Sequence, residues 1–156
     1  MRKILALLIL LVTGMAIAVT SPASAAPAPG LAPQTFTVEL TPSGDPDGSG
    51  SAVLTIDLRS GTVCYEITVT GIGEPTEPAA GIGNAHIHSF SQGGAIAVDL
   101  GTEFVPVTGA TDTYEAVDCV SAKRGDLVQV LLHPEDYYVN VHTTAFPAGA
   151  VQGTLA

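Results

Sequence analysis

The chain has 156 residues, and its 15 acidic side chains outnumber five basic ones, which gives a formal charge of −10. This length is enough for one domain. The shortage of Lys and Arg argues against nucleic acid and anionic lipid surfaces as partners, because both require cations to neutralise phosphates.

The first 25 residues have the pattern of a secretory signal peptide. Arg2 and Lys3 form a positive head, residues 4–19 are almost wholly apolar, and Ala23-Ser24-Ala25 matches a small-residue cleavage signal. The alternative is a membrane anchor, but the apolar run is short for a span and ends at the cleavage signal. We therefore expect removal of residues 1–25 during export, leaving a secreted chain without a membrane span.

Export would make the protein still more acidic. The mature chain of about 130 residues would keep all 15 acidic side chains but only Arg59, Lys123 and Arg124 as basic ones, for a formal charge of −12. Residues 26–33 are rich in proline and are expected to form a flexible lead-in. The folded domain is then predicted to occupy residues 34–156.

Two cysteines remain after cleavage, Cys64 and Cys119. An even number of cysteines in an exported chain predicts a disulfide. Its closed loop would contribute about 4 kcal/mol in the chain-entropy model. The alternatives are two free thiols or two metal ligands, although no Cys-x-x-Cys spacing favours a metal.

Alternation of apolar and polar residues predicts β-strands through most of the chain. The first two strands are expected at residues 35–40 and 52–58, with a hairpin turn at 45–50 that is dense in Asp, Gly, Pro and Ser. Further strands are expected at residues 63–69, 84–90, 95–100, 104–107, 113–117, 137–143 and 150–155.

One segment has the periodicity of a helix instead. Leu127, Val130 and Leu131 follow an i, i+3, i+4 spacing, and Pro134 stops the run. The sequence therefore predicts an all-β fold, a sandwich or small barrel of antiparallel strands, with one short helix near residues 123–133.

Three histidines stand on predicted strands with informative neighbours. His86 and His88 are two residues apart, so a strand projects both from one face. In residues 137–143, His142 belongs to the polar face. If the two strands are neighbours, the three imidazoles converge outside the core, shielded only by loops. Three neutral imidazoles are good ligands for copper or zinc, with a fourth position for water or for His133.

The histidines also have an interpretation without a metal. On the polar side of strands they can hydrogen-bond loop carbonyls and carboxylates. His133 stands at the predicted helix end, where an imidazole caps the helix and interacts favourably with its dipole. Neither a Gly-x-Ser-x-Gly elbow nor a His-Glu-x-x-His helix is present. No catalytic residue is therefore assigned, and a role other than enzymatic is favoured.

Four blocks of the sequence resemble the CHRD (chordin) domain. They are Gly83-Asn84-Ala85-His86-Ile87-His88, Ala95-Ile96-Ala97-Val98-Asp99-Leu100, Tyr137-Tyr138-Val139-Asn140-Val141-His142-Thr143 and Phe146-Pro147-Ala148-Gly149-Ala150-Val151-Gln152-Gly153-Thr154-Leu155. The resemblance covers about residues 34–156. One departure is that the family's Arg-Gly-Gln-Leu ending is Gln152-Gly153-Thr154-Leu155 here, so any role of that Arg is absent.

The resemblance implies an extracellular, β-rich module. CHRD domains occur in chordin, which binds growth factors of the bone morphogenetic type, and in secreted microbial proteins. We therefore expect a secreted binding or structural module with an extracellular partner of unknown identity.

The His-x-His strand is also similar to the copper strand of Cu/Zn superoxide dismutases, which are β-barrel enzymes. This similarity implies, as the alternative, a copper- or zinc-binding metalloprotein with a surface histidine site. Two features argue against a dismutase. A charge of −12 offers superoxide no cationic guide, and the dismutase zinc loop with its run of His and Asp has no counterpart.

Overall fold

The computed structural model describes residues 32–77, 79, 81–101 and 104–156. The expected signal peptide (residues 1–25) and most of the expected lead-in lie outside these residues. The described elements, in chain order, are β1 (Gln34–Pro42), β2 (Ser49–Asp57), β3 (Thr62–Thr70), β4 (Ala85–Ser89), β5 (Ala95–Asp99), β6 (Val105–Pro106), β7 (Thr113–Ser121), α1 (Arg124–Leu132), the 3₁₀ turn η1 (Pro134–Asp136), β8 (Tyr137–Val141) and β9 (Val151–Thr154).

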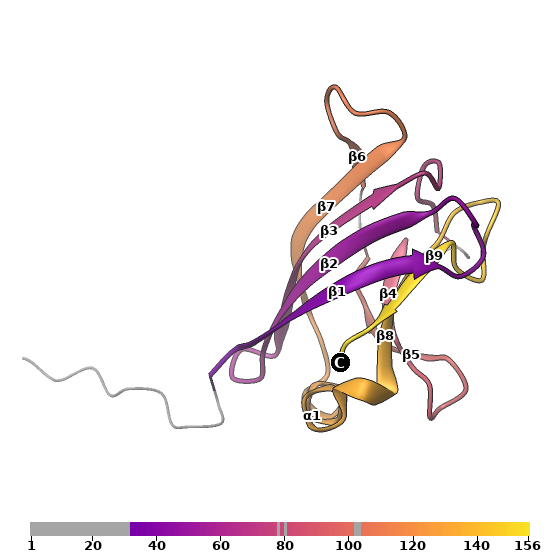
Figure 1. Cartoon of the computed structure of the whole chain (residues 1–156). Coiled ribbons are helices and arrows are strands. Elements are labelled where there is room, and N and C mark those ends of the chain that lie inside the picture. The colour runs from indigo at the N-terminus through magenta and orange to yellow at the C-terminus, as the bar shows by residue number, and fades with distance from the viewer. Residues whose placement is uncertain (1–31, 78, 80, 102–103) are drawn as a thin grey trace, which may run out of the picture.

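The strands form one antiparallel sheet in the order β5-β4-β8-β9-β1-β2-β3-β7-β6. The sheet curls so that β4 and β5 face β2 and β3 across a common interior, and α1 lies at one end of the molecule (Figure 1). Over the described residues, this confirms the predicted all-β fold with one short helix.

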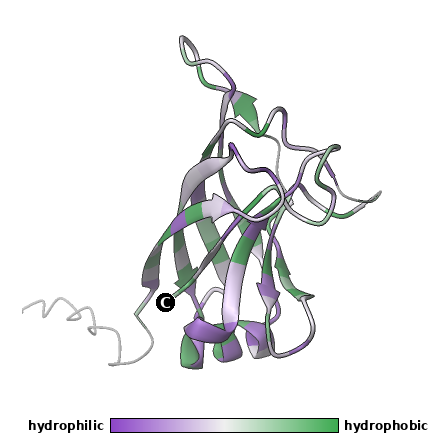
Figure 2. Cartoon of the chain, turned by 45° about the vertical axis from the view of Figure 1, so that its right-hand side comes forward, coloured by the Kyte–Doolittle hydropathy of each residue, from purple (hydrophilic) through white to green (hydrophobic). Residues whose placement is uncertain are grey.

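One half of the sheet, which we call the long half, consists of β1, β2, β3 and β7 with the short edge strand β6. β1 and β2 form the expected hairpin, with Gln34 opposite Ile56 and Leu40 opposite Gly50. Hydrophobic and hydrophilic residues alternate along these strands in Figure 2. Alternation on a half-buried sheet sends every second side chain into the core, here including Leu54 and Ile67, both fully buried.

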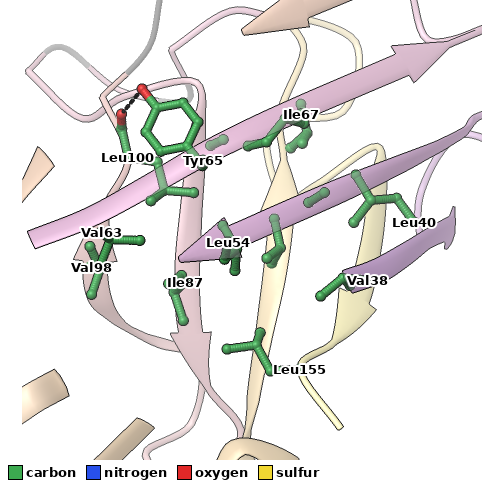
Figure 3. Packing of buried hydrophobic residues seen from close by; sticks show 14 of the residues in the cluster. Val38, Leu40, Leu54, Val63, Tyr65, Ile67, Ile87, Val98, Leu100 and Leu155 are labelled. Carbon is green, nitrogen blue, oxygen red and sulfur yellow. Dashed lines mark hydrogen bonds between the residues drawn. The ribbon is translucent and has the colours of Figure 1, made fainter. Parts of the chain in front are cut away.

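The other half, which we call the short half, consists of β5, β4, β8 and β9. Its inward side chains complete the core, because Ile87 and Val98 face residues of the long half such as Leu54 and Val63 (Figure 3). The Tyr65 hydroxyl donates a hydrogen bond to the Leu100 carbonyl at 2.9 Å, which links the two halves.

The helix closes one end of the core. Leu127 and Val130 of α1 are buried. The helix ends where predicted, since Pro134 starts the 3₁₀ turn and the His133 N–H bonds to the Gln129 carbonyl at 2.9 Å. Among the described residues, no helix is long and apolar enough to cross a membrane.

The predicted disulfide is present between Cys64 and Cys119, with an S–S distance of 2.04 Å. The two cysteines are directly paired on the neighbouring strands β3 and β7. The bond lies on the outer, partly exposed face of the long half. It therefore connects two strands that are already hydrogen-bonded, rather than joining the two halves.

Candidate metal centre

Three histidines meet on the outer face of the short half. β4 and β8 are neighbouring antiparallel strands that place Asn140 opposite His86 and Tyr138 opposite His88. His142 directly follows β8, and its N–H bonds to the Asn84 carbonyl at 2.9 Å. The strand neighbourhood on which the predicted cluster depended is therefore present.

The three rings are close enough to share one ion. One candidate ligand atom from each of His86, His88 and His142 lies within 4.8 Å of the other two. Nδ1 of His86 and Nε2 of His142 are 3.0 Å apart. Three imidazole nitrogens thus converge on a single point between two strands.

The cluster is not the surface site that was expected. His86, His88 and His142 are only 0%, 8% and 4% exposed. The reason is that two loops, one containing residues 75–76 and the other residues 143–149, are held against this face. The Thr76 N–H bonds to the His142 carbonyl at 3.0 Å, and Pro75 forms a bridge with Thr143.

The second covering loop depends on a glycine. Asn140 donates from Nδ2 to the Ala148 carbonyl at 3.1 Å. The next residue, Gly149, has a φ of +125°, and a Cβ at this position would lie 2.2 Å from Asn140 Oδ1. Only glycine combines this backbone conformation with so close an approach to the Asn140 side chain.

Two of the rings are oriented by backbone carbonyls. Nδ1 of His88 lies 2.8 Å from the Gly94 carbonyl, and Nδ1 of His142 lies 3.0 Å from the Pro147 carbonyl. A carbonyl only accepts, so each Nδ1 carries the hydrogen and each Nε2 carries a free lone pair. Metal-binding histidines characteristically donate from their second nitrogen in this way.

The third ring faces a carboxylate. Asp99 is paired with His86 across β5 and β4, and its Oδ1 is 3.7 Å from His86 Nε2. A bulge in this strand pair shifts the register between Ile87 and His88, so that Ile96 rather than Ala97 lies opposite His88. Each ring therefore has one nitrogen near an oxygen. In His88 and His142 this is Nδ1, near a carbonyl, and in His86 it is Nε2, near Asp99.

Burial keeps two of these rings neutral. Desolvation, reinforced by the neighbouring His142, lowers the pKa of His86 to about 4, although Asp99 opposes the shift. Desolvation also lowers the pKa of His142, against the effect of the Pro147 carbonyl. Neutral imidazole is the form that binds a metal ion.

Some buried polar atoms of the site lack a hydrogen-bond partner. Within the described residues, these are Nε2 of His86, Nε2 of His88 and Oδ1 of Asn140. Leaving such an atom unsatisfied costs about 1–3 kcal/mol. A bound ligand would account for the Nε2 lone pair of His88, whose ring lies 5.3 Å from the His86 ring and 5.9 Å from the His142 ring between centroids.

Aromatic rings border the cluster on one side. Tyr138 stacks on His88 with 5.2 Å between centroids, and Phe90 stacks on Tyr138 at 4.3 Å. Burial raises the pKa of Tyr138. The stack therefore covers one face of the His88 ring.

The structure does not bring His133 to the cluster. It lies at the end of α1 with a side chain that is 55% exposed, and its Nδ1 is 3.9 Å from Glu135 Oε1. This position agrees with the predicted role at a helix end and provides no fourth ligand from His133.

Sequence reasoning missed the groups that orient the rings. Asp99 had a local signal, because it is the charged residue at the end of the apolar run 95–100. The Gly94 and Pro147 carbonyls had none, since every residue carries a carbonyl and only the folded loops select these two.

The family can now be assigned. The family model for the CHRD domain matches residues 33–155, which contain every described strand and all three clustered histidines. Comparisons with curated proteins and with solved structures give no significant match. Because the family match covers nearly the whole described chain, this protein belongs to the CHRD domain family.

Proposed function

We propose that this chain is an exported extracellular module that binds one transition-metal ion through His86, His88 and His142. The CHRD family is one of extracellular modules, and a disulfide fits an oxidising compartment. The observation that carries the metal proposal is the convergence of three buried imidazoles whose candidate ligand atoms lie within 4.8 Å of one another.

The ligand chemistry favours copper or zinc. Imidazole nitrogen suits both metals, and typical metal–nitrogen distances of about 2.0–2.1 Å place two ligands of a tetrahedral site about 3.4 Å apart. The 3.0 Å between His86 and His142 and the 4.8 Å limit for the whole set bracket this separation. Small ring movements would therefore suffice, and a three-histidine set leaves one coordination position open.

The competing proposal is a module whose histidines form only a hydrogen-bonded network, with a protein or surface partner elsewhere. The 3.0 Å contact between His86 and His142 is the observation that favours it, because one hydrogen can bridge these nitrogens without any ion. This network leaves Nε2 of His88 without a partner among the described residues, which is the difficulty that a metal removes.

Metal analysis distinguishes the two proposals. Protein recovered without an affinity tag from the medium of a secreting host is expected to contain one copper or zinc ion per chain by mass spectrometry. After removal of metal with a chelator, titration with Zn²⁺ or Cu²⁺ should restore this stoichiometry. His88→Ala and His142→Ala should each weaken affinity at least 100-fold, whereas His133→Ala, outside the cluster, should leave it unchanged.

Two results would overturn the metal proposal. One is protein that retains no metal and shows no thermal shift with added copper or zinc. The other is undiminished affinity in the double variant His88→Ala, His142→Ala. In either case the plain extracellular module would be the better description.

Export is tested separately. The intact mass of the protein in the medium is expected to correspond to a chain that begins at Ala26, after cleavage of residues 1–25. A secreted mass that includes Arg2 and Lys3 would contradict the proposed cleavage.

A further inference from the structure

We infer that His86 is a tautomer switch controlled by Asp99: its Nδ1–H bonds to His142 in the metal-free protein, whereas with metal bound Nδ1 is the ligand and Nε2–H bonds to Asp99. This inference rests on the proposed metal function. It specifies the ligand atoms as Nδ1 of His86 and Nε2 of both His88 and His142. It also assigns Asp99 a role as a positioning residue that does not itself touch the metal.

The metal-free tautomer follows from the hydrogen-bond pattern. His142 donates from Nδ1 to the Pro147 carbonyl, so its Nε2 is an acceptor. Nδ1 of His86 lies 3.0 Å from that acceptor and must carry the hydrogen. Nε2 of His86 is then a bare lone pair, buried without a hydrogen-bond partner and facing the Asp99 carboxylate at 3.7 Å.

In this tautomer Nδ1 of His86 therefore has a hydrogen-bond partner and Nε2 has none. Two acceptors face each other at His86 Nε2 and Asp99, which is an unfavourable arrangement in a partly buried site. The separation of 3.7 Å is too long for a hydrogen bond but short enough to become one after a small ring movement.

Metal binding reverses the assignment. An ion that takes the lone pair of His142 Nε2 removes the acceptor of the His86 hydrogen bond, and the neighbouring His86 Nδ1 can bind the ion only after losing its hydrogen. One proton leaves Nδ1 and one is taken up at Nε2, so the ring stays neutral, no net proton is released, and no electron is transferred. The new Nε2–H then donates to a carboxylate, which is a strong, charge-assisted bond.

The surroundings hold Asp99 in place for this role. Its Oδ1 accepts hydrogen bonds from the Gly101 N–H at 2.8 Å and the Gly83 N–H at 3.2 Å. A Cβ on residue 83 would lie 2.5 Å from the same oxygen, so glycine is required for this approach. The carboxylate is thus held by backbone N–H groups from two loops, opposite Nε2 of His86.

The first test reads the tautomers directly. The full mature chain carrying ¹⁵N-labelled histidine is examined by NMR without metal and with one equivalent of Zn²⁺. His86 should change from Nδ1–H to Nε2–H on zinc addition, while His88 and His142 should remain Nδ1–H in both states and serve as internal controls.

The outcomes of this test separate the inference from the proposed function. Zinc that perturbs all three rings while His86 keeps its Nδ1–H, or a metal-free His86 that already carries Nε2–H, would overturn the tautomer switch and leave the three-histidine site standing. Zinc that perturbs none of the rings would overturn both.

The second test removes the charge of Asp99. Asp99→Asn should weaken zinc affinity 10- to 100-fold, the usual effect of losing the partner of a ligand histidine, and should speed the exchange of the His86 Nε2–H with water. Asn keeps an oxygen for the Gly83 and Gly101 N–H groups, which protects the fold. Asp126→Asn is the matched control, because Asp126 lines the same groove as Asp99. Equal zinc affinity in both variants would overturn the role of Asp99.

Discussion

The two halves of the sheet use their strands in different ways. β1, β2, β3 and β7 are each nine residues long; the first three bury only alternate residues, and β7 buries only Ala116. β4 and β8 have five residues each, and β4 buries all of them while β8 buries four. The outer face of the long half is exposed to solvent, whereas the outer face of the short half is covered by loops.

This difference determines where polar groups can be buried. The outer face of the long half carries the disulfide and exposed side chains such as Val53 and Val117. The covered face of the short half carries His86, His88 and His142, whose nitrogens must be partnered by loop carbonyls, by a carboxylate or by a ligand. The disulfide and the candidate site thus lie on different parts of one sheet.

Removal of the disulfide should have the largest effect on stability and none on the site. The disulfide joins two cysteines that are 55 residues apart in the sequence. The double variant Cys64→Ser, Cys119→Ser removes this link and should lower the free energy of unfolding by about 4 kcal/mol. Zinc affinity of the folded variant should be unchanged, because the bond lies on the long half. Urea denaturation and zinc titration measure the two quantities. Affinity that falls together with stability would show that the halves are not separable.

A methyl group at position 149 should disturb the short half. Gly149→Ala adds strain at a φ of +125° and a clash with Asn140. It should cost about 1–3 kcal/mol of stability and, by moving the Pro147 carbonyl away from His142, about tenfold in zinc affinity.

Gly109→Ala is the matched control for this substitution. Gly109 also has a positive φ, +82°, but a Cβ there would meet no described atom within 4 Å. It should therefore show strain alone and no change in zinc affinity. Equal losses of zinc affinity in the two variants would contradict the role of the Asn140 contact.

Tyr65 tests the link between the halves. Tyr65→Phe removes the bond to the Leu100 carbonyl and should cost about 1 kcal/mol at neutral pH. Burial, and then the charges of Asp118 and Asp99, raise the pKa of Tyr65 to about 12 in the folded protein.

The pH dependence of this variant has a definite sign. Because the folded-state pKa lies above the unfolded value of 10.0, the stabilisation by Tyr65 is complete below pH 10 and is lost as pH rises to about 12. The stability gap between wild type and Tyr65→Phe should therefore narrow over this window in denaturation curves. A gap that stays constant would show that the hydroxyl is not the group responsible.

The smallest changes in stability are expected from truncating two exposed apolar side chains, Phe90 and Val117. Phe90 is 48% exposed and stacks on Tyr138 beside the cluster, so Phe90→Ala should cost about 0.5–1.5 kcal/mol. Val117, 69% exposed on the long half, should tolerate Val117→Ala within about 0.5 kcal/mol. Thermal denaturation of the two variants measures the difference, and equal shifts would exclude a contribution from the aromatic stack.

Much of the fold was predictable because its signals are local. The alternation of Val63, Tyr65, Ile67 and Val69 places these residues in the core, where all four are buried. The helix and its end before Pro134 follow equally from residues only a few positions apart. Periodicity reports which face of an element is apolar, and this is enough to define strands, a helix and an all-β class.

The site was predictable only in its composition. The spacing of His86 and His88, and the polar face that holds His142, identified the three residues and their common side of the sheet. Shielding by loops was expected, but near-complete burial of the three rings was not, because it depends on how closely two loops fold back over that side. Asp99 was missed as a partner of His86, since a bulge between β4 and β5 sets which residues lie opposite each histidine.

The sequence by itself therefore determined the class of fold, the pairing of the two cysteines and the identity of the three clustered histidines. Each of these can be predicted from the local spacing of residues or from the number of cysteines. Only the tertiary structure decided that β4 lies beside β8, that loops seal the cluster from water, and that the Gly94 and Pro147 carbonyls orient two of its rings. The physical reason is that local periodicity specifies which face of a strand a side chain occupies, whereas neighbouring strands and loop coverage arise from contacts between residues far apart in the chain.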